Sequence, residues 1–220
     1  MTKHTHNGVE YFLTDPSPHV LFLSGMHGNE YESGILLEQF LKTAPYAYLY
    51  VPTVSPSAIA AKKRKNAFGN DINRMFFPNT SDREAQNLMH VLASRTFRLC
   101  IDVHEDPDRT GSFYVYDTEI MNPEQLQNYR DSVRSTGIRL YTGVDDEEDE
   151  KLGLLVKQGY ISTAFEQHGT YSGFFSRWAF EQDVAKRIFT LEIPGKAPIT
   201  RKEQLIKTVV PFLYHSFGVE

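Results

Sequence analysis

The feature that most constrains the fold is an alternation of short apolar runs with segments of helical periodicity. The apolar runs are rich in Val, Ile, Leu and aromatic residues, and several are almost continuous, as expected of strands covered on both faces. They occupy residues 19–25, 47–52, 97–103, 113–117, 160–166 and 187–193. Segments with helical spacing lie between or after them, at residues 29–44, 82–95, 122–136 and 200–217. This alternation predicts an α/β fold, an α/β/α sandwich around a central mixed, mostly parallel sheet.

Length and composition favour one domain. The 220 residues suit an ordinary α/β domain, and an apolar fraction of 40% is sufficient for one large core. No Gly/Ser/Pro-rich linker and no internal repeat divides the chain, so we expect a single domain over residues 1–220. The formal net charge of −5, with Lys and Arg scattered outside residues 61–65, argues against nucleic acid as a partner.

The cysteine content and the first residues bear on location. Cys100 is the single cysteine, which excludes an internal disulfide and suits a reducing compartment. Residues 1–12 are polar and lack the apolar run of a secretory signal, and no window approaches 18 consecutive apolar residues. We therefore expect a soluble, cytoplasmic protein without a membrane partner, and the sequence leaves the oligomeric state open.

A histidine and a glutamate three residues apart lie where a predicted strand gives way to a helix. The stretch FLSGMHGNEYESG, residues 22–34, places His27 and Glu30 at the carboxyl edge of the sheet, where open α/β sheets form ligand crevices. Imidazole and carboxylate there can converge on one cation, and the pair suits Zn²⁺. Two solvated side chains are the plainer interpretation of an isolated HxxE, so a third ligand is needed.

His104 is the candidate third ligand, because it ends another β-type run in CIDVHEDPD. Two histidines and one glutamate leave a fourth position open to water, which is typical of catalytic zinc. Strand alternation puts Asp102 on the same side as His104, from where it can orient the imidazole. The alternative is a strand-end histidine flanked by acidic residues and satisfied by the backbone.

Two further segments carry candidate substrate-binding or catalytic groups. In RKNAFGNDINRMFFP, residues 64–78, Arg64, Asn73 and Arg74 can clamp a substrate carboxylate or polarise a carbonyl. A basic surface loop paired with local acids is the alternative. Glu192 lies inside the apolar strand FTLEIPG, where burial disfavours a charged carboxylate and would suit a general base toward water. A surface salt bridge at the strand edge is the alternative there.

Two other patterns are interpreted as structure. The acidic run DDEEDE, residues 145–150, lacks the ligand alternation and the turn glycine of a calcium loop, so we expect a solvated loop. The aromatic stretches FYVY and YSGFFSRW can wall a cleft, although aromatic residues at such spacing lie more often in a core.

The motifs HxxE, RxNxxGxDxNR and DxH, followed by a strand glutamate near the C-terminus, together resemble the zinc metallocarboxypeptidase superfamily. This superfamily includes the carboxypeptidase A type and its succinylglutamate desuccinylase and aspartoacylase relatives, and the resemblance spans residues 19 to about 195. It implies one Zn²⁺ per chain, held by three ligands: His27, Glu30 and His104.

The resemblance also implies roles for the other candidates. Asn73 and Arg74 would hold the terminal carboxylate of the substrate, and Arg64 would polarise the scissile carbonyl. Glu192 would act as general base and then as acid. Tyr171, in HGTYSGFF, lies near the spacing of the tyrosine that closes over the substrate in the superfamily, although its surroundings match poorly.

Metal-assisted amide hydrolysis is the activity that the resemblance implies. The leading function is a carboxypeptidase that removes a C-terminal residue from small peptides or muropeptides. An N-acyl amino acid amidohydrolase of the desuccinylase type is the alternative, since DVHED resembles its DxH motif, but the short stretch after Glu192 leaves no room for the C-terminal β domain of that branch. A zinc- or peptide-binding module without catalysis is a further alternative, which the presence of both Glu192 and Arg64 opposes.

Overall fold

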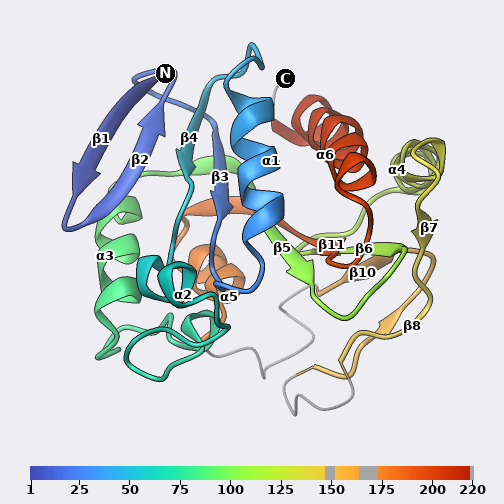
Figure 1. The fold of residues 1–220 in the computed structure, drawn as a ribbon. Coiled ribbons are helices and arrows are strands. Elements are labelled where there is room, and N and C mark those ends of the chain that lie inside the picture. The colour runs from blue at the N-terminus through green and yellow to red at the C-terminus, as the bar shows by residue number, and fades with distance from the viewer. Residues whose placement is uncertain (147–151, 164–172, 219–220) are drawn as a thin grey trace.

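The predicted α/β fold is confirmed by the computed structural model, which describes residues 1–146, 152–163 and 173–218 (Figure 1). A nine-stranded sheet has the order β1-β2-β4-β3-β5-β11-β6-β10, with β7 beside β6, and a small hairpin of β8 and β9 lies apart. The strands are β1 (Thr2–His6), β2 (Val9–Leu13), β3 (Val20–Ser24), β4 (Tyr48–Val51), β5 (Phe97–Asp106), β6 (Ser112–Asp117), β7 (Arg139–Leu140), β8 (Gly143–Val144), β9 (Leu155–Val156), β10 (Tyr160–Ser162) and β11 (Ala185–Pro194).

The centre of the sheet is parallel and its margins are mixed. Strands β4, β3, β5 and β11 run parallel to one another, and β6 is antiparallel to β11. At the other margin β2 is antiparallel to β4 and to β1. The prediction of a mixed, mostly parallel sheet therefore holds in its central strands.

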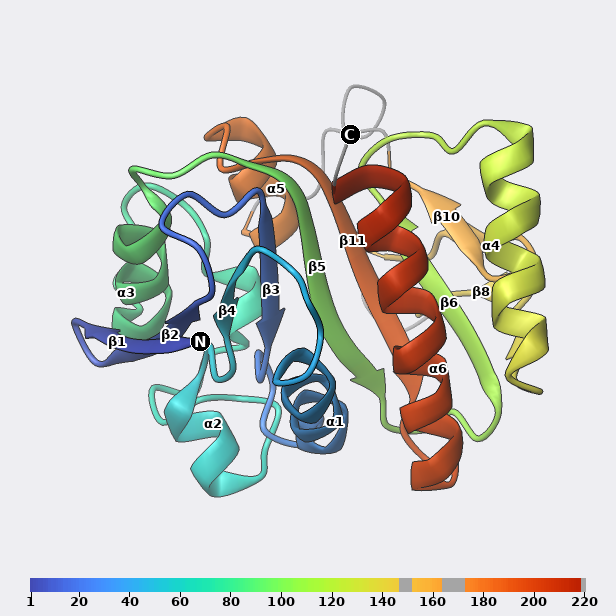
Figure 2. The same ribbon diagram turned by 90° about the horizontal axis from the view of Figure 1, so that it is seen from above.

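Helices cover both faces of the sheet, which completes the three layers (Figure 2). Alternation along β3 sends Val20 and Phe22 toward α1, α4 and α6, and Leu21 and Leu23 toward α3 and α5. The helices are α1 (Tyr31–Leu41), α2 (Pro56–Ala61), α3 (Arg83–Leu92), α4 (Pro123–Ser135), α5 (Phe175–Glu181) and α6 (Ile199–Leu213), with short helical turns η1 (Ile72–Arg74) and η2 (Tyr214–Gly218). No helix in the described ranges has the length and apolarity needed to cross a membrane.

Side-chain caps fix where two of these helices begin. Asp82 accepts the backbone N–H groups of the first turn of α3, and Asn122 and Gln125 form a reciprocal capping box at α4, where Pro123 takes the first helical position. Glu30 occupies the corresponding position before α1 but makes no side-chain cap. Its carboxylate is used elsewhere.

Several elements were not predicted. The N-terminal strands β1 and β2 form a hairpin around Asn7 and Gly8, both of which have positive φ as that tight turn requires. The helices α2 and α5 and the short strands β7, β8 and β9 were also missed, because each is too brief to show a period. Of the predicted strand over 160–166, β10 covers residues 160–162, and residues 164–166 lie outside the described ranges.

The fold brings three strand ends to one edge of the sheet. β3 and β11 flank β5 in parallel, so their carboxyl ends meet, and His104 on β5 is paired with Glu192 on β11. On β5, Cys100 packs on the α3 and α5 side while Val103 packs on the opposite side. By alternation, His104 lies on the face of Cys100, and its neighbour Glu105 lies on the face of α1 and α6.

Gly28 is required where the chain leaves β3. A Cβ at this position would lie 1.7 Å from the carbonyl oxygen of Ala58 in α2. We expect Gly28→Ala to destabilise the protein by about 2–3 kcal/mol and to lower Tm by roughly 5–10 °C in calorimetry. Gly111→Ala is the control, since nothing lies within 4 Å of its Cβ position. Equal Tm values for the two variants would contradict the close approach of this turn to α2.

Candidate metal centre and cleft

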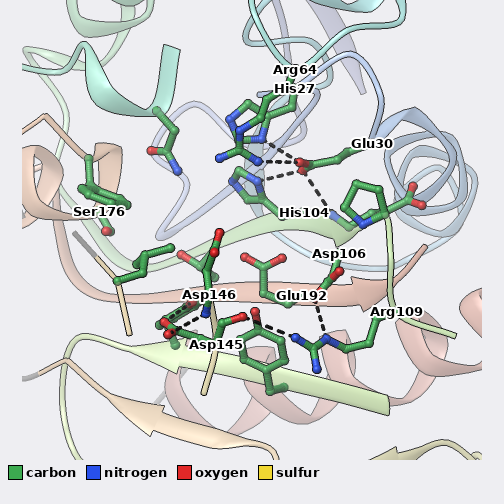
Figure 3. Close-up of a pocket in the computed structure, with 18 of the residues that line it drawn as sticks. His27, Glu30, Arg64, His104, Asp106, Arg109, Asp145, Asp146, Ser176 and Glu192 are labelled. Atoms are coloured by element: carbon green, nitrogen blue, oxygen red, sulfur yellow. Dashed lines mark hydrogen bonds and ion pairs between the residues drawn. The ribbon is translucent and has the colours of Figure 1, made fainter. Parts of the chain in front are cut away.

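Three side chains converge at the carboxyl edge of the sheet (Figure 3). His27 follows β3, Glu30 precedes α1 and His104 lies on β5, and their ligand atoms all lie within 4.8 Å of one another. Each residue is at most 3% exposed, so the interpretation of His27 and Glu30 as solvated side chains is wrong. His27 Nδ1 lies 2.7 Å from Glu30 Oε1, and His104 Nδ1 lies 3.0 Å from Glu30 Oε2.

A carboxylate stands behind each imidazole. His27 Nε2 lies 2.9 Å from Asp71 Oδ1, and His104 Nε2 lies 3.1 Å from Asp102 Oδ2. With Nε2–H donated to these carboxylates, both Nδ1 atoms face Glu30 and are the nitrogens that would hold a cation. The sequence predicted the contact of Asp102 with His104, whereas the contact of Asp71 with His27 was missed.

The electrostatics of this cluster favour bound positive charge. Burial opposes the charge on Glu30, but His27 and His104 hold the pKa of its carboxyl well below the usual range. Burial likewise opposes a charged His104, yet Asp102 and Glu30 raise the pKa of its imidazole well above the usual value. Asp102 Oδ1 is buried without a hydrogen-bond partner among the described residues. Two imidazoles and a carboxylate in such a field fit a zinc ion.

Glu192 lies beside this cluster on β11, directly opposite His104 in the register. Removal from water raises the pKa of its carboxyl to about 8, and the negative charges of Glu30 and Asp106 act in the same direction, against His104 and Arg64. No salt bridge joins Glu192 to another described residue, so the surface ion pair considered from the sequence is not formed within the described ranges.

Arg64 reaches the cluster from the loop after α2. Its Nε donates to Asp71 Oδ2 at 2.9 Å, and its Nη1 lies 3.6 Å from Glu30 Oε1. The same Asp71 therefore contacts both His27 and Arg64, and these two partners lower the pKa of its carboxyl against the effect of burial. Asp71 thus ties the Arg64 guanidinium to the side of the cavity where His27 and Glu30 lie.

Asn73 and Arg74 lie in η1 and are held by the start of α5. Asn73 Oδ1 accepts the backbone N–H of Phe175 at 3.0 Å, which leaves the amide donors of its side chain available to the cavity. The Arg74 guanidinium stacks on the ring of Phe174, 3.9 Å from the centroid. Gly173 is needed for this contact, because a Cβ there would lie 2.3 Å from the carbonyl oxygen of Arg74.

One cavity of about 570 Å³ is lined by the two histidines and Glu30, by Glu192 and Arg64, and by the Asn73–Arg74 pair. Its opposite wall comes from β6 and from the segment after β8, and Figure 3 shows Arg109, Asp145 and Asp146 across from the histidines. Tyr114 and Tyr116 also line the cavity, whereas the alternate residues of the same strand, Phe113 and Val115, point into the core. The FYVY stretch thus supplies both cleft wall and core.

The prediction of a solvated loop at residues 145–150 is wrong for its first residue. Asp145 is 6% exposed and accepts hydrogen bonds from the backbone N–H groups of Gly153 and Leu154 and from the Tyr116 hydroxyl. It is buried because these three donors replace water around its carboxylate. Residues 147–150 of the acidic run, and Tyr171, lie outside the described residues.

Arg109 was not singled out from the sequence. It forms an ion pair with Asp106 and stacks on the Tyr141 ring, 3.6 Å from the centroid, at the wall of the cavity. Its position three residues after Asp106, in the loop that follows the DxH motif, is the signal that could have drawn attention to it.

A family comparison decides the relationship that the motifs suggest. The succinylglutamate desuccinylase/aspartoacylase catalytic domain matches residues 16–209, which is most of the chain. The chain belongs to this family. Membership in the succinylglutamate desuccinylase/aspartoacylase family supports a hydrolase. No curated protein matches the chain in sequence.

Solved structures show the same fold at low sequence identity. A candidate metallopeptidase from Shewanella amazonensis SB2B aligns with a TM-score of 0.77 and 18% identity, covering 100% of this chain and 88% of its own. A succinylglutamate desuccinylase/aspartoacylase from Rhodobacter sphaeroides aligns with a TM-score of 0.59 and 16% identity, covering 96% and 60%. The product-bound cell shape determinant protein Csd4 from Helicobacter pylori aligns with a TM-score of 0.66 and 14% identity, covering 96% and 56%.

The ligand assignment can be tested by metal content. We expect His104→Ala to reduce bound zinc to well below one equivalent in elemental analysis, because one of three converging ligands is lost. His90→Ala is the matched control, since His90 is exposed on α3 and should leave the zinc content unchanged. A zinc content close to one equivalent in His104→Ala would refute the assignment of His27, Glu30 and His104 as the ligand set.

The raised pKa of Glu192 makes a pH-dependent contribution to stability. Between pH 4.5 and about 8 the folded state keeps a proton on this carboxyl that the unfolded state releases, so the free energy of unfolding falls as pH rises. In chelator-treated protein we expect Glu192→Gln to match the parent near pH 4.5. At pH 8.5 its Tm should exceed that of the parent by roughly 10 °C, since a pKa raised from 4.5 to about 8 corresponds to about 4–5 kcal/mol. A constant Tm difference across this range would show that Glu192 does not titrate there.

Proposed function

We propose that the protein is a zinc-dependent hydrolase that cleaves an amide bond next to a free carboxylate, with a carboxypeptidase acting on peptides or muropeptides as the leading function. One observation carries the proposal. A buried cluster of two histidines and a glutamate shares a single cavity with Glu192 and with the Asn73–Arg74 pair. The single domain over residues 1–220 would then be the catalytic domain.

The donor set identifies the residues that would hold the metal. His27 and His104 would bind through Nδ1 and Glu30 through its carboxylate, with Asp71 and Asp102 fixing the two imidazole rings. When bound, a zinc ion would supply a Lewis acid that polarises a carbonyl and lowers the pKa of water. The remaining tasks fall to side chains of the cavity.

Glu192 is suited to move the proton. Burial raises the pKa of the Glu192 carboxyl, which makes it a stronger base than an exposed glutamate while leaving the protonated form acidic enough to protonate a leaving amine. Its register position opposite His104 puts the base beside the metal ligands and on the same face of the sheet. Glu192 would therefore take a proton from water and deliver it to the leaving nitrogen.

The arginines are suited to hold negative charge. Arg64 is anchored through Nε by Asp71, so the outer edge of its guanidinium can donate to an oxyanion that develops on the scissile carbonyl. Asn73 is anchored by Phe175 and Arg74 by Phe174, and amide and guanidinium groups are of the kind that bind a carboxylate. Substrates with a free carboxylate beside the scissile bond are therefore preferred.

The family match favours a second candidate with the same chemistry. The matching domain is that of desuccinylases and aspartoacylases, so an N-acyl amino acid amidohydrolase would use the same ligands, base and carboxylate donors. A binding module without catalysis is the least supported alternative, because such a module needs neither a raised pKa at Glu192 nor a guanidinium placed beside Glu30.

A substrate panel tests these candidates. Zinc-loaded protein would be incubated with peptides bearing free or amidated C-termini, with muropeptides, and with N-acyl amino acids such as succinylglutamate, and the products read by mass spectrometry. We expect cleavage of peptides with a free C-terminus and none of the amidated forms. Cleavage confined to N-acyl amino acids would instead support an N-acyl amino acid amidohydrolase. Zinc binding without hydrolysis of any substrate would support a binding module without catalysis.

The role of Glu192 has its own test. Glu192→Gln should retain zinc but lose about two to four orders of magnitude in kcat on whichever substrate the panel identifies, as expected for a general base. Glu203→Gln, on the solvent side of α6, is the matched control and should leave kcat unchanged. A Glu192→Gln rate within tenfold of the parent would rule out this role.

A further inference from the structure

Lys202 is a fully buried lysine close to the metal-ligand cluster but outside the cavity. It lies in the first turn of α6, is 0% exposed, and is absent from the cavity lining. Its Nζ donates to Glu105 Oε2 at 2.7 Å and to Glu32 Oε2 at 2.8 Å. Glu105 is 5% exposed, whereas the Glu32 side chain is 42% exposed, so Glu105 is the buried partner that depends most on this charge.

Glu105 in turn holds the first turn of α1. Its Oε1 accepts the backbone N–H of Ser33 at 2.6 Å. The first N–H groups of a helix need acceptors from outside the helix, and Glu30, which precedes α1, provides none because its side chain is turned toward the two histidines. Glu105 therefore caps from β5 a helix whose own capping residue serves as a metal ligand.

Glu105 also contacts the ligand Glu30 directly. Its backbone N–H donates to Glu30 Oε2 at 3.2 Å, the same oxygen that lies 3.0 Å from His104 Nδ1. His104 and Glu105 are consecutive on β5 and both line the cavity, but the His104 side chain contacts Glu30 and Asp102, whereas the Glu105 side chain contacts α1 and α6. A displacement of Glu105 would move His104, Glu30 and the start of α1 together.

We propose that Lys202 is a positioning residue for the metal site, which it serves by locking Glu105 between β5 and the first turn of α1. The proposal rests on the metal site of the proposed function. Without Lys202, Glu105 would carry a buried charge with a single backbone donor on its side chain, and such a charge is relieved by turning toward water or by admitting it. Either response would make the positions of His104 and Glu30 relative to each other less well fixed.

Zinc affinity is the measurement that isolates this role. The dissociation constant would be determined by competition with a chromophoric chelator, at a temperature at which each variant is shown to be folded. We expect Lys202→Met to raise the zinc dissociation constant about 10- to 100-fold, as is typical when a group that orients a metal ligand is removed.

Arg187→Met is the matched control. Arg187 forms a buried ion pair on this same face of the sheet. Its Nη2 lies 2.6 Å from Asp117 Oδ2, and Arg187 precedes Glu192 by five residues on β11. Its removal should lower Tm to a similar extent but leave the zinc dissociation constant within threefold of the parent. If Lys202→Met weakened zinc binding only by lowering the stability of the fold, Arg187→Met would raise the zinc dissociation constant to the same extent.

A double variant tests the mechanism. Lys202→Met with Glu105→Gln removes both charges yet keeps an oxygen that can accept the Ser33 N–H, so zinc affinity should return to within about threefold of the parent. This variant also keeps the proposal testable if Lys202→Met alone does not fold.

The outcomes separate the two proposals. Zinc binding by the parent together with unchanged affinity in Lys202→Met, or equal losses in Lys202→Met and Arg187→Met, would overturn the positioning role alone. If Lys202→Met does not fold, a double variant that folds but binds zinc more than tenfold weaker than the parent would overturn it. A parent that binds no zinc would overturn the metal site and the positioning role together.

Discussion

The register between β5 and β11 is the constraint on which the site depends. Parallel pairing sets His104 beside Glu192, and alternation sends both toward the cavity while their neighbours enter the core or the opposite layer. A slip of one residue would carry Glu192 to the face of α1 and α6 and would bury a carboxylate among aliphatic side chains. The apolar residues on both sides of Glu192, Leu191 and Ile193, prevent this, because each fills the core at 0% exposure.

The cluster is a set of buried charges that satisfy one another. Glu30, Asp71 and Asp102 surround the two histidines, and Arg64 joins Asp71 from outside. Each carboxylate contacts a nitrogen, so the desolvation cost of one group is offset by the field of the next. Glu192 stands apart, since removal from water, together with the negative charges of Glu30 and Asp106, raises the pKa of its carboxyl. Under the proposed function, one arrangement of charges would supply both the cation site and the base.

The sequence was sufficient for the central strands, the long helices and the residues that converge, because continuous apolar runs and polar groups at strand ends are local signals. The hairpin around Asn7 and Gly8 also had a local signal, because an Asn-Gly pair between two short runs is typical of a tight β-turn. The polar composition of residues 1–12 concealed it. The burial of Asp145 could not be predicted, because its donors include Tyr116, far away in sequence, and a loop that closes on it. Nor could the capping of α1 by Glu105, since it depends on which strand lies beside that helix.

The strand order has a consequence for how the protein folds. Each of the neighbours β3, β5 and β11 is separated from the next by about a third of the chain, so each pairing must close a long loop before its contacts can stabilise it. His27 and Glu30 lie just after β3, His104 lies on β5, and Glu192 arrives only with β11, the last strand in the described sequence order. A chain still emerging from the ribosome would therefore hold all three candidate ligands before it holds the candidate base, so the chemistry of the proposed function would have to wait for the last strand.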